Sequence, residues 1–460
     1  MSSTVALTSQ PLPAEVLEFF IDALSKDRSA DARRAMRTSA LVCRSFRNRA
    51  HHHIFWRLEF VQPPYSTSSK TLSRLFNFRG LVEAGQKLPL LTTPLYHIRS
   101  FKLAMDGSLF EAYAILENPD LVSILELIQK YSWDIRKVSL KGSSFPIVWP
   151  DLTWDFRMAL KQLCRSSPSL TTLCLENMTG VPHTMLLGTK IRHVRFHLIE
   201  FAVGALDLLP RFRYNHPVEP QLESIDIDYT FPFPEDNPLN HSGTDEMSLG
   251  QYQSIFSGVK RLKYLIYRSD DLERFLSLAQ KLSSSLDTVD LELSNSDNGF
   301  LRALTWEIPL DSLPNLGRIL LRHKSLVSVG TRHPLVKVAS ILRNMIIPAS
   351  LQAIEVAFEV RSDPPWLKTG HFFPDPHNWA LLDKILTDNK FERVREVVFH
   401  LRYFTVQAPP WAFNETVFVD RCRSCIQDVF PLLYASLKTV HVDIRVLPVV
   451  GGNEEPIFDS

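Results

Sequence analysis

The sequence predicts an α/β fold in which helix–strand units follow one another along the chain and their strands run parallel. One apolar pattern recurs from residue 98 to residue 437, and helical periodicity fills many of the intervals between its copies. Pro and Ser occur where helix gives way to strand. Repeated units of 20 to 45 residues that cannot bury their own apolar faces are typical of a solenoid. An ordinary α/β domain with similar strands remains the alternative, because the pattern is permissive.

The recurring pattern is an apolar residue, two others, an apolar residue, one other, and a third apolar residue. Its last two apolar positions alternate with other residues, as in a strand with one buried face. The copies are on average about 34 residues apart, with spacings from 21 to 43 residues. They begin at Ile98, Ile135, Leu170, Ile191, Leu222, Leu262, Leu286, Leu316, Leu351, Val394 and Leu437.

Helical spacing of apolar residues separates several of these copies. The expected helices cover residues 121–131, 154–164, 270–282, 336–345, 379–386 and 417–433. Runs such as Ser166-Ser167-Pro168-Ser169 end a helix and release the chain into an extended segment. Three proline-rich insertions, at 231–247, 361–377 and 407–413, are expected to be loops packed over the edge of the array.

Side chains between the buried strand positions are expected to point away from the core. If the strands line a concave face, these side chains form the substrate-binding surface, and their mixed charge suits recognition of a protein surface. Solvated strand faces without a ligand are the alternative. The candidate residues are His193, Arg195, His197, Asp226, Asp228, Asp290, Glu292, Arg318 and Arg322.

The composition argues against binding of nucleotides or nucleic acid. The chain has 460 residues with 51 Lys and Arg against 50 Asp and Glu, so it lacks the basic surplus of a nucleic-acid-binding protein. Only 16 glycines accompany 30 prolines, whereas phosphate-binding loops use glycines in clusters. The charge is uneven along the chain: residues 1–60 have nine basic and six acidic side chains, and the remainder has 42 against 44.

The compartment predicted from the sequence is the cytoplasm or the nucleus. No basic segment precedes an apolar stretch at the start, so we expect no secretory signal. No apolar run reaches the length of a membrane span, so we expect no membrane partner. Five cysteines are too few for a disulfide framework over this length and indicate reduced thiols.

The first sixty residues predict a pair of helices. Pro13 and Glu15 suit the first turn of a helix that carries an apolar stripe. A second helical pattern places Ala35, Val42 and Phe46 on one face. Eight arginines and one acid lie between residues 28 and 57, which indicates either a solvated helix face or a basic surface for an acidic partner.

This segment resembles an F-box motif of the fungal type. The family pattern runs Leu-Pro-x-Glu with an apolar pair, a spaced apolar helix, and then Leu-Val-Cys-Arg with an aromatic residue. The matching stretches are Leu12-Pro13-x-Glu15-Val16-Leu17, Ile21 with Leu24, and Ala40-Leu41-Val42-Cys43-Arg44-Ser45-Phe46. Phe46 stands where the family often has tryptophan. The later pattern resembles leucine-rich repeats, although its spacing is uneven and no asparagine ladder follows the strands.

The resemblance implies that the N-terminal helices bind a Skp-type adaptor of a cullin ubiquitin ligase. The residues expected to face the adaptor are Leu12, Pro13, Val16, Leu17, Ile21, Leu41, Val42 and Phe46. The chain would then be the substrate-recognition subunit of a Skp–cullin–F-box ligase, with an unidentified protein substrate. The alternative is an interaction scaffold whose first helices cap the array and have no link to ubiquitination, or simply the first helical pair of a larger domain.

The expected organisation is therefore N-terminal adaptor-binding helices at 1–60 and a linker with a capping segment at 61–96. An irregular leucine-rich-repeat-like solenoid covers 97–447, and a tail covers 448–460.

No motif for catalysis, metal binding or a cofactor stands out. Cys422 and Cys425 form the one CxxC and have no second pair, so a buried structural pair is expected rather than a zinc or redox site. His51, His52 and His53 are neighbours on different sides of a helix, and they are expected to extend the basic face. We therefore expect no enzymatic activity, no cofactor and no metal, although folding could still assemble a site from distant residues.

Overall fold

The computed structural model describes residues 14–27, 29–63, 66–87, 94–201, 222–228, 256–293, 307–326, 334–362, 376–405 and 415–448. Over these ranges the protein is mixed α/β, and its paired strands run parallel. The chain divides into two compact units. The first unit comprises Met1–Pro220 with Asn237–Ile255, and the second comprises Gln221–Asp236 with Phe256–Ser460.

The first unit begins with three helices, α1 (Ala14–Lys26), α2 (Ala30–Ser39) and α3 (Arg44–Phe55). Ser29 caps α2 by accepting a hydrogen bond from the backbone of Ala32. The helices bury Ile21, Met36, Ala40 and Ala50, and Leu24, Phe46 and Ile54 pack against this cluster. The sequence predicted one continuous second helix, which is wrong because the chain turns at residues 40–43 and Cys43 is extended.

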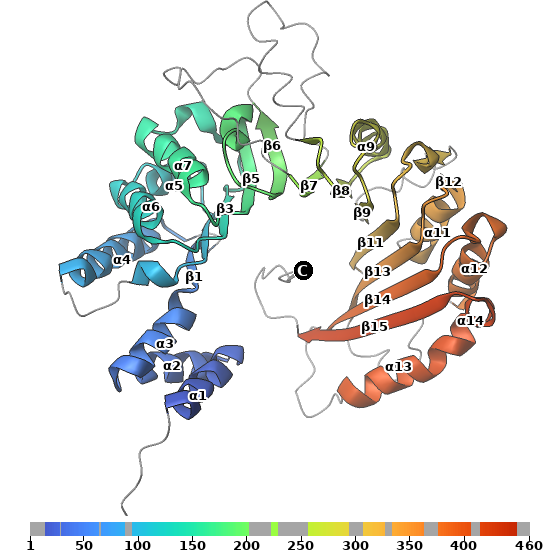
Figure 1. Ribbon diagram of the computed structural model, residues 1–460, viewed down its shortest axis with the longest axis horizontal. Coiled ribbons are helices and arrows are strands. Elements are labelled where there is room, and N and C mark those ends of the chain that lie inside the picture. The colour runs from blue at the N-terminus through green and yellow to red at the C-terminus, as the bar shows by residue number, and fades with distance from the viewer. Residues whose placement is uncertain are drawn as a thin grey trace, which may run out of the picture. The chain divides into compact units, whose positions relative to one another are not determined.

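The rest of the first unit alternates strands with helices. Its strands are β1 (Arg57–Gln62), β2 (Ser100–Met105), β3 (Lys137–Lys141), β4 (Ile147–Val148), β5 (Thr172–Val181) and β6 (His193–Phe201). Its helices are α4 (Ser69–Lys87), α5 (Leu109–Leu116), α6 (Pro119–Tyr131) and α7 (Trp154–Ser166), with short 3-10 turns η1 (Pro94–His97), η2 (Trp149–Asp151) and η3 (His183–Leu186). The strand order is β1-β2-β3-β5-β6, with β4 paired to β5 (Figure 1).

The second unit repeats this arrangement. Its main strands are β7 (Ser224–Asp228), β8 (Arg261–Ile266), β9 (Thr288–Leu293), β11 (Arg318–Leu326), β13 (Ala353–Ser362), β14 (Glu396–Thr405) and β15 (Thr439–Pro448), paired in that order. Two short strands, β10 (Ile308–Pro309) and β12 (Met345–Ile346), pair separately. Its helices are α9 (Ser269–Lys281), α11 (Pro334–Asn344), α12 (Pro376–Leu386), α13 (Glu415–Val429) and α14 (Pro431–Ala435), with 3-10 turns η6 (Leu310–Ser312) and η8 (Asn389–Phe391). The helices α9, α11 and α12 lie on one face of these strands, and we call the opposite face of the strands the open face (Figure 1).

Ten of the eleven copies of the apolar pattern lie in register with a strand, and each of these strands begins two residues after its copy begins. The sixth copy was placed three residues too far along the chain. The register pairs Leu262 with Val289 and Tyr264 with Leu291, so the copy begins at Val259 and not at Leu262. Val259, Leu262 and Tyr264 are buried, whereas Leu265 is partly exposed.

A further copy of the pattern, Phe55-x-x-Leu58-x-Phe60, leads into β1 and was missed. Its register with β2 matches that of later strands, because Leu58 pairs with Phe101 and Phe60 with Leu103. The expected linker therefore contains regular structure, namely the end of β1 and the helix α4.

Serine hydroxyls link successive units near the starts of the strands. Ser132 donates to the carbonyl of Ile98 over 2.7 Å, Ser285 to that of Val259 over 2.8 Å, and Ser350 to that of Leu316 over 2.9 Å. Each acceptor is the first residue of the preceding copy of the pattern. Ser285 and Ser350, which stand where helix was expected to give way to strand, thus also satisfy carbonyls of the neighbouring unit.

The expected helices between the copies are present, with one interruption. The stretch 417–433 is broken at Phe430, because Pro431 cannot continue the hydrogen bonding of α13 and starts α14 instead. The insertions at 231–247 and 407–413 and most of that at 361–377 lie outside the described residues, as do residues 449–460 of the expected tail. Among the helices that the structure describes, none is long and apolar enough to cross a membrane.

Candidate interaction surfaces

The N-terminal helices expose a group of large apolar side chains, which we call the N-terminal apolar surface. Val16, Phe19 and Phe20 are 38%, 69% and 58% exposed on α1, and Leu41 and Val42 are 79% and 66% exposed between α2 and α3. Val16, Phe19 and Phe20 are spaced i, i+3 and i+4, so they share one helix face. Several exposed large apolar groups on one small module favour contact with another surface.

Asp22 holds α1 against α3 by accepting from two side chains. Both its oxygens bind the guanidinium of Arg49, the Nε contact measuring 2.7 Å, and Nε2 of His53 lies 2.8 Å from Oδ1. The hydrogen bond from Arg49 is the main cause that keeps the pKa of Asp22 well below its usual range. This contact fixes which face of α1 is turned inward and which stays exposed.

The residues expected to face an adaptor differ in their exposure to solvent, where the structure describes them. Val16, Leu41 and Val42 are exposed and therefore accessible to a partner. Ile21 is 1% exposed and Phe46 packs beside it, so in this conformation both belong to the helix cluster; this corrects the expectation that they face a partner. Leu12 and Pro13 lie outside the described residues, as does the side chain of Leu17. Sequence reasoning missed Phe19, although its i+3 spacing from Val16 was a usable signal.

The open face of each unit is formed by the side chains that alternate along each strand with the buried ones. On β1, β2, β3, β5 and β6 these positions carry the bases Arg57, Lys102, Lys137, Lys141 and Arg195 and the acids Glu59 and Glu176. On β7, β8, β9, β11, β13, β14 and β15 the described side chains at these positions include the bases Arg261, Lys263, Arg318, Arg322, Arg402 and Arg445 and the acids Asp226, Asp228, Asp290, Glu292, Glu355, Glu396 and Asp443. Over the described side chains, the first open face therefore has a basic surplus, whereas the charges of the second nearly balance.

Ion pairs cross the open face of the second unit from strand to strand. Asp290, which is fully buried, lies 2.8 Å from Arg322 and 3.4 Å from Arg261. Lys263 contacts Asp226 at 3.2 Å and Glu292 at 3.1 Å. Burial raises the pKa of Asp290, although both arginines act in the opposite direction. These charges are therefore largely neutralised within the sheet.

The network continues over β13, β14 and β15 around His400. Its two ring nitrogens lie 3.1 Å from Glu355 and 3.5 Å from Asp443. Glu355 also binds Arg318, which reaches Glu396 at 3.6 Å. The hydrogen bond from His400 is the largest cause that lowers the pKa of Glu355 to about 2.

The nine residues expected to bind a substrate lie at open-face positions of their strands, in both units. Three of these side chains are buried, whereas all nine were expected to point outward to a ligand. Asp228, Asp290 and Glu292 are at most 3% exposed. Arg322 turns toward Asp290 and Arg318 toward Glu355. The alternation of buried and unburied strand positions thus predicts correctly on which face of the sheet these side chains lie. It does not reveal which charged side chains form ion pairs with neighbouring strands.

The run of three histidines does not extend a basic face. His51 and His52 are partly buried, and the ring of His52 lies 5.9 Å from that of His97 in η1. Burial lowers the pKa of His51 and of His52, and it lowers that of His97 to about 4. His53 faces Asp22 instead. His52 therefore packs against η1, at the junction between the N-terminal helices and the first strands.

The CxxC pair lies on α13, as expected. Cys422 is buried and Cys425 is partly buried, and both thiols are free. Burial raises the pKa of Cys422 to about 12, which makes its thiolate unfavourable. Within the described part of the chain, no group of three His, Cys, Asp or Glu side chains is arranged to hold a metal ion.

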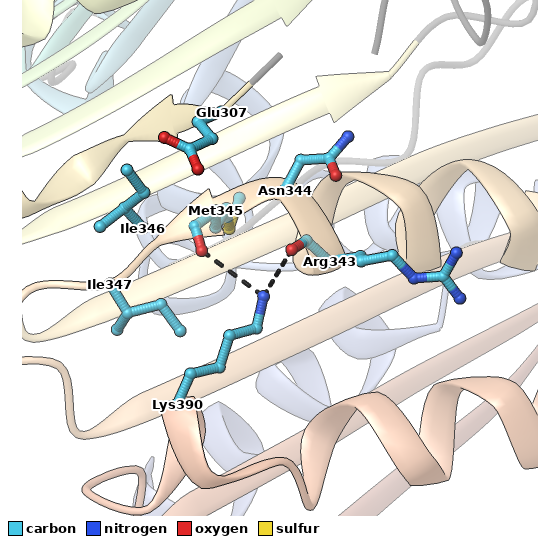
Figure 2. Close-up of a pocket in the computed structure, with 7 residues that line it drawn as sticks. All are labelled: Glu307, Arg343, Asn344, Met345, Ile346, Ile347 and Lys390. Carbon is cyan, nitrogen blue, oxygen red and sulfur yellow. Dashed lines mark hydrogen bonds between the residues drawn. The ribbon is translucent and has the colours of Figure 1, made fainter. Parts of the chain in front are cut away.

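A pocket of about 490 Å³ lies between the end of α11, β12 and η8 in the second unit (Figure 2). Lys390 lines this pocket, and its ammonium group donates to the carbonyls of Leu342 and Arg343 over 2.7 Å each. Lys390 therefore satisfies carbonyls at the C-terminal end of α11. Figure 2 shows Arg343 pointing away from this ammonium and Glu307 on the opposite wall, so the charged groups do not converge.

Comparison of this chain with models of known protein families gives no match, and comparison with curated proteins gives none either.

Proposed function

We propose that this chain is the substrate-recognition subunit of a Skp–cullin–F-box ubiquitin ligase, with no catalysis of its own. The observation that carries the proposal is the N-terminal apolar surface, since Leu41 and Val42 of the F-box-like stretch are 79% and 66% exposed beside Val16. Burial of such side chains contributes roughly 1.5–3 kcal/mol each, and a few of them dominate an interface. A Skp-type adaptor is the partner that the resemblance implies.

The remainder of the chain would act as an irregular, leucine-rich-repeat-like solenoid that holds a protein substrate. Successive parallel strands in one register and the serine contacts between units support this part of the proposal. The ligase partner would then act on a substrate held at high effective concentration. A scaffold without a ligase link remains the alternative, and adaptor binding separates the two.

The test is co-purification of the full chain with a Skp-type adaptor. Leu41→Asp/Val42→Asp should weaken adaptor binding by about 100-fold or more, because two buried anchors become charged. The matched control is Phe76→Asp/Leu81→Asp, which alters two side chains on α4 that are 66% and 48% exposed. A second variant, Leu12→Ala/Pro13→Ala/Leu17→Ala, probes the start of the motif.

Two outcomes contradict the proposal. The first is an intact chain that does not retain the adaptor at micromolar concentration. The second is equal retention by the Leu41→Asp/Val42→Asp variant and its control. In either case, the scaffold function becomes the better explanation of the N-terminal helices.

A further inference from the structure

The open face of the first unit contains two lysines set among hydroxyl groups on three neighbouring strands. In one row Ser100 pairs with Lys137, and Lys137 pairs with Thr172. In the next row Lys102 pairs with Ser139. We call these five residues the Lys–hydroxyl patch. The two lysines lie diagonally across the parallel strands β2 and β3, offset by one strand and two residues, so their Cα atoms are about 8 Å apart.

These side chains are available to a ligand. Over the residues that the structure describes, Lys102 and Lys137 make no ion pair, and the hydroxyls of Ser100, Ser139 and Thr172 make no hydrogen bond. Lys137 is exposed, and the other four side chains are partly exposed. This differs from Lys141 at the edge of the patch, which contacts Glu176 at 3.4 Å and Asp106 at 3.9 Å.

We infer that the Lys–hydroxyl patch binds an extended, acidic segment of a partner protein, with Asp or Glu at alternate positions. This inference deepens the proposed function, on which it rests for the idea that the array holds a protein ligand. An extended segment spaces alternate side chains by about 6.6–6.8 Å, so two of its carboxylates can each reach one of the two long lysine side chains. Ammonium and hydroxyl groups can both donate to carboxylate oxygens.

Carboxylates suit this patch better than phosphate. A phosphate dianion is best held by the forked donors of arginine, whereas the patch offers two separate ammonium groups. Glu59 and Glu176 flank the patch, because Glu59 pairs with Lys102 and Glu176 with Lys141 in the strand register. The negative charges of Glu59 and Glu176 repel a dianion concentrated at one point more strongly than they repel two single negative charges that lie apart.

The test measures binding of a labelled peptide to the full chain by fluorescence anisotropy. The probe is a twelve-residue peptide with Glu at alternate positions, and its reference has Gln at the same positions. We expect the Glu peptide to bind more tightly and to lose affinity as salt rises. Lys102→Gln/Lys137→Gln should weaken its binding by about five- to tenfold, since each exposed ion pair contributes modestly.

The matched control is Lys70→Gln/Lys87→Gln, which removes the same charge from two exposed lysines on α4. This variant should bind the Glu peptide as the intact chain does. Circular dichroism of both variants verifies that each is folded. The adaptor is absent from the assay, and Leu41→Asp/Val42→Asp should leave peptide binding unchanged, so failure of this inference and failure of adaptor binding are distinguishable.

Three results would overturn the inference: equal binding of the Glu and Gln peptides, equal weakening by the patch variant and its control, or binding that requires phosphoserine in place of Glu. The third result would keep the surface and change the chemistry of its ligand from carboxylate to phosphate.

Discussion

The open faces of the two units use the same strand positions but treat charge in different ways. In the second unit Asp290 is buried between Arg261 and Arg322, and Glu355 is bound by Arg318 and His400. In the first unit, among the residues described, two central lysines have no carboxylate partner. The comparison shows that the position of a residue along its strand determines on which face of the sheet its side chain lies. The residues on the neighbouring strands determine whether a charged side chain forms an ion pair that stabilises the sheet or stays available to a ligand.

The largest effect is expected where the second face is most buried. Arg322→Leu removes the nearer of the two arginines that pair with Asp290 and leaves Arg261, at 3.4 Å, beside a carboxylate that is fully buried. Removing one member of a buried pair costs several kcal/mol, so we expect the free energy of unfolding to fall by about 3 kcal/mol. Urea denaturation followed by circular dichroism measures this loss.

Arg423→Leu on α13 is the control for this substitution, because its ion pair with Asp420 is 3.7 Å long and both side chains are more than 60% exposed. Its effect should stay within about 0.5 kcal/mol. Equal losses in the two variants would show that the open-face network is no more important to stability than a surface pair.

Glu355 makes the second face sensitive to acid. Its pKa is lowered from 4.5 to about 2, so its contribution is complete above pH 4.5 and is lost as the pH falls toward 2. Glu355→Gln should cost about 2 kcal/mol at pH 7 and progressively less below pH 4.5. Unfolding at a series of pH values measures the difference from the intact chain, and a difference that stays constant down to pH 2 would contradict this role of Glu355.

Much of the fold could be predicted because its signal is local. The buried positions of a strand repeat every second residue, and this periodicity located ten copies of the pattern in their correct register. The sixth copy failed because Leu262, Leu265 and Tyr267 satisfy the same spacing as Val259, Leu262 and Tyr264. Pairing with β9 selects the second set, and pairing between residues 27 positions apart leaves no mark in either strand alone.

The candidate surfaces were less predictable because they depend on contacts between distant residues. Ile21 and Val16 are both apolar and lie on one helix, and only packing against α3 distinguishes the buried one from the exposed one. Arg322 and Asp290 are 32 residues apart, and the register of β9 and β11 brings them together. Ion pairs between neighbouring strands can therefore be assigned only when the fold is known.

A smaller effect is expected from the serine contacts, which both units share. Ser350→Ala removes the hydroxyl that donates to the carbonyl of Leu316, a residue that is fully buried, so we expect a loss of about 1 kcal/mol. Ser312→Ala should cost less, because its hydroxyl bonds the carbonyl of Pro309 three residues away at an exposed turn. Thermal unfolding of the two variants compares them, and a larger loss for Ser312→Ala would mean that the contacts between units are not the stabilising ones.

The smallest effect on stability is expected from the Lys–hydroxyl patch itself. Lys102→Gln/Lys137→Gln breaks no ion pair between described residues, so the free energy of unfolding should change by less than about 0.5 kcal/mol. The same urea denaturation used for Arg322→Leu measures it. A loss comparable with that of Arg322→Leu would show that the two lysines stabilise the sheet, and the contrast between the two faces would then be wrong. A negligible loss together with weakened peptide binding would separate a ligand surface in the first unit from a structural one in the second.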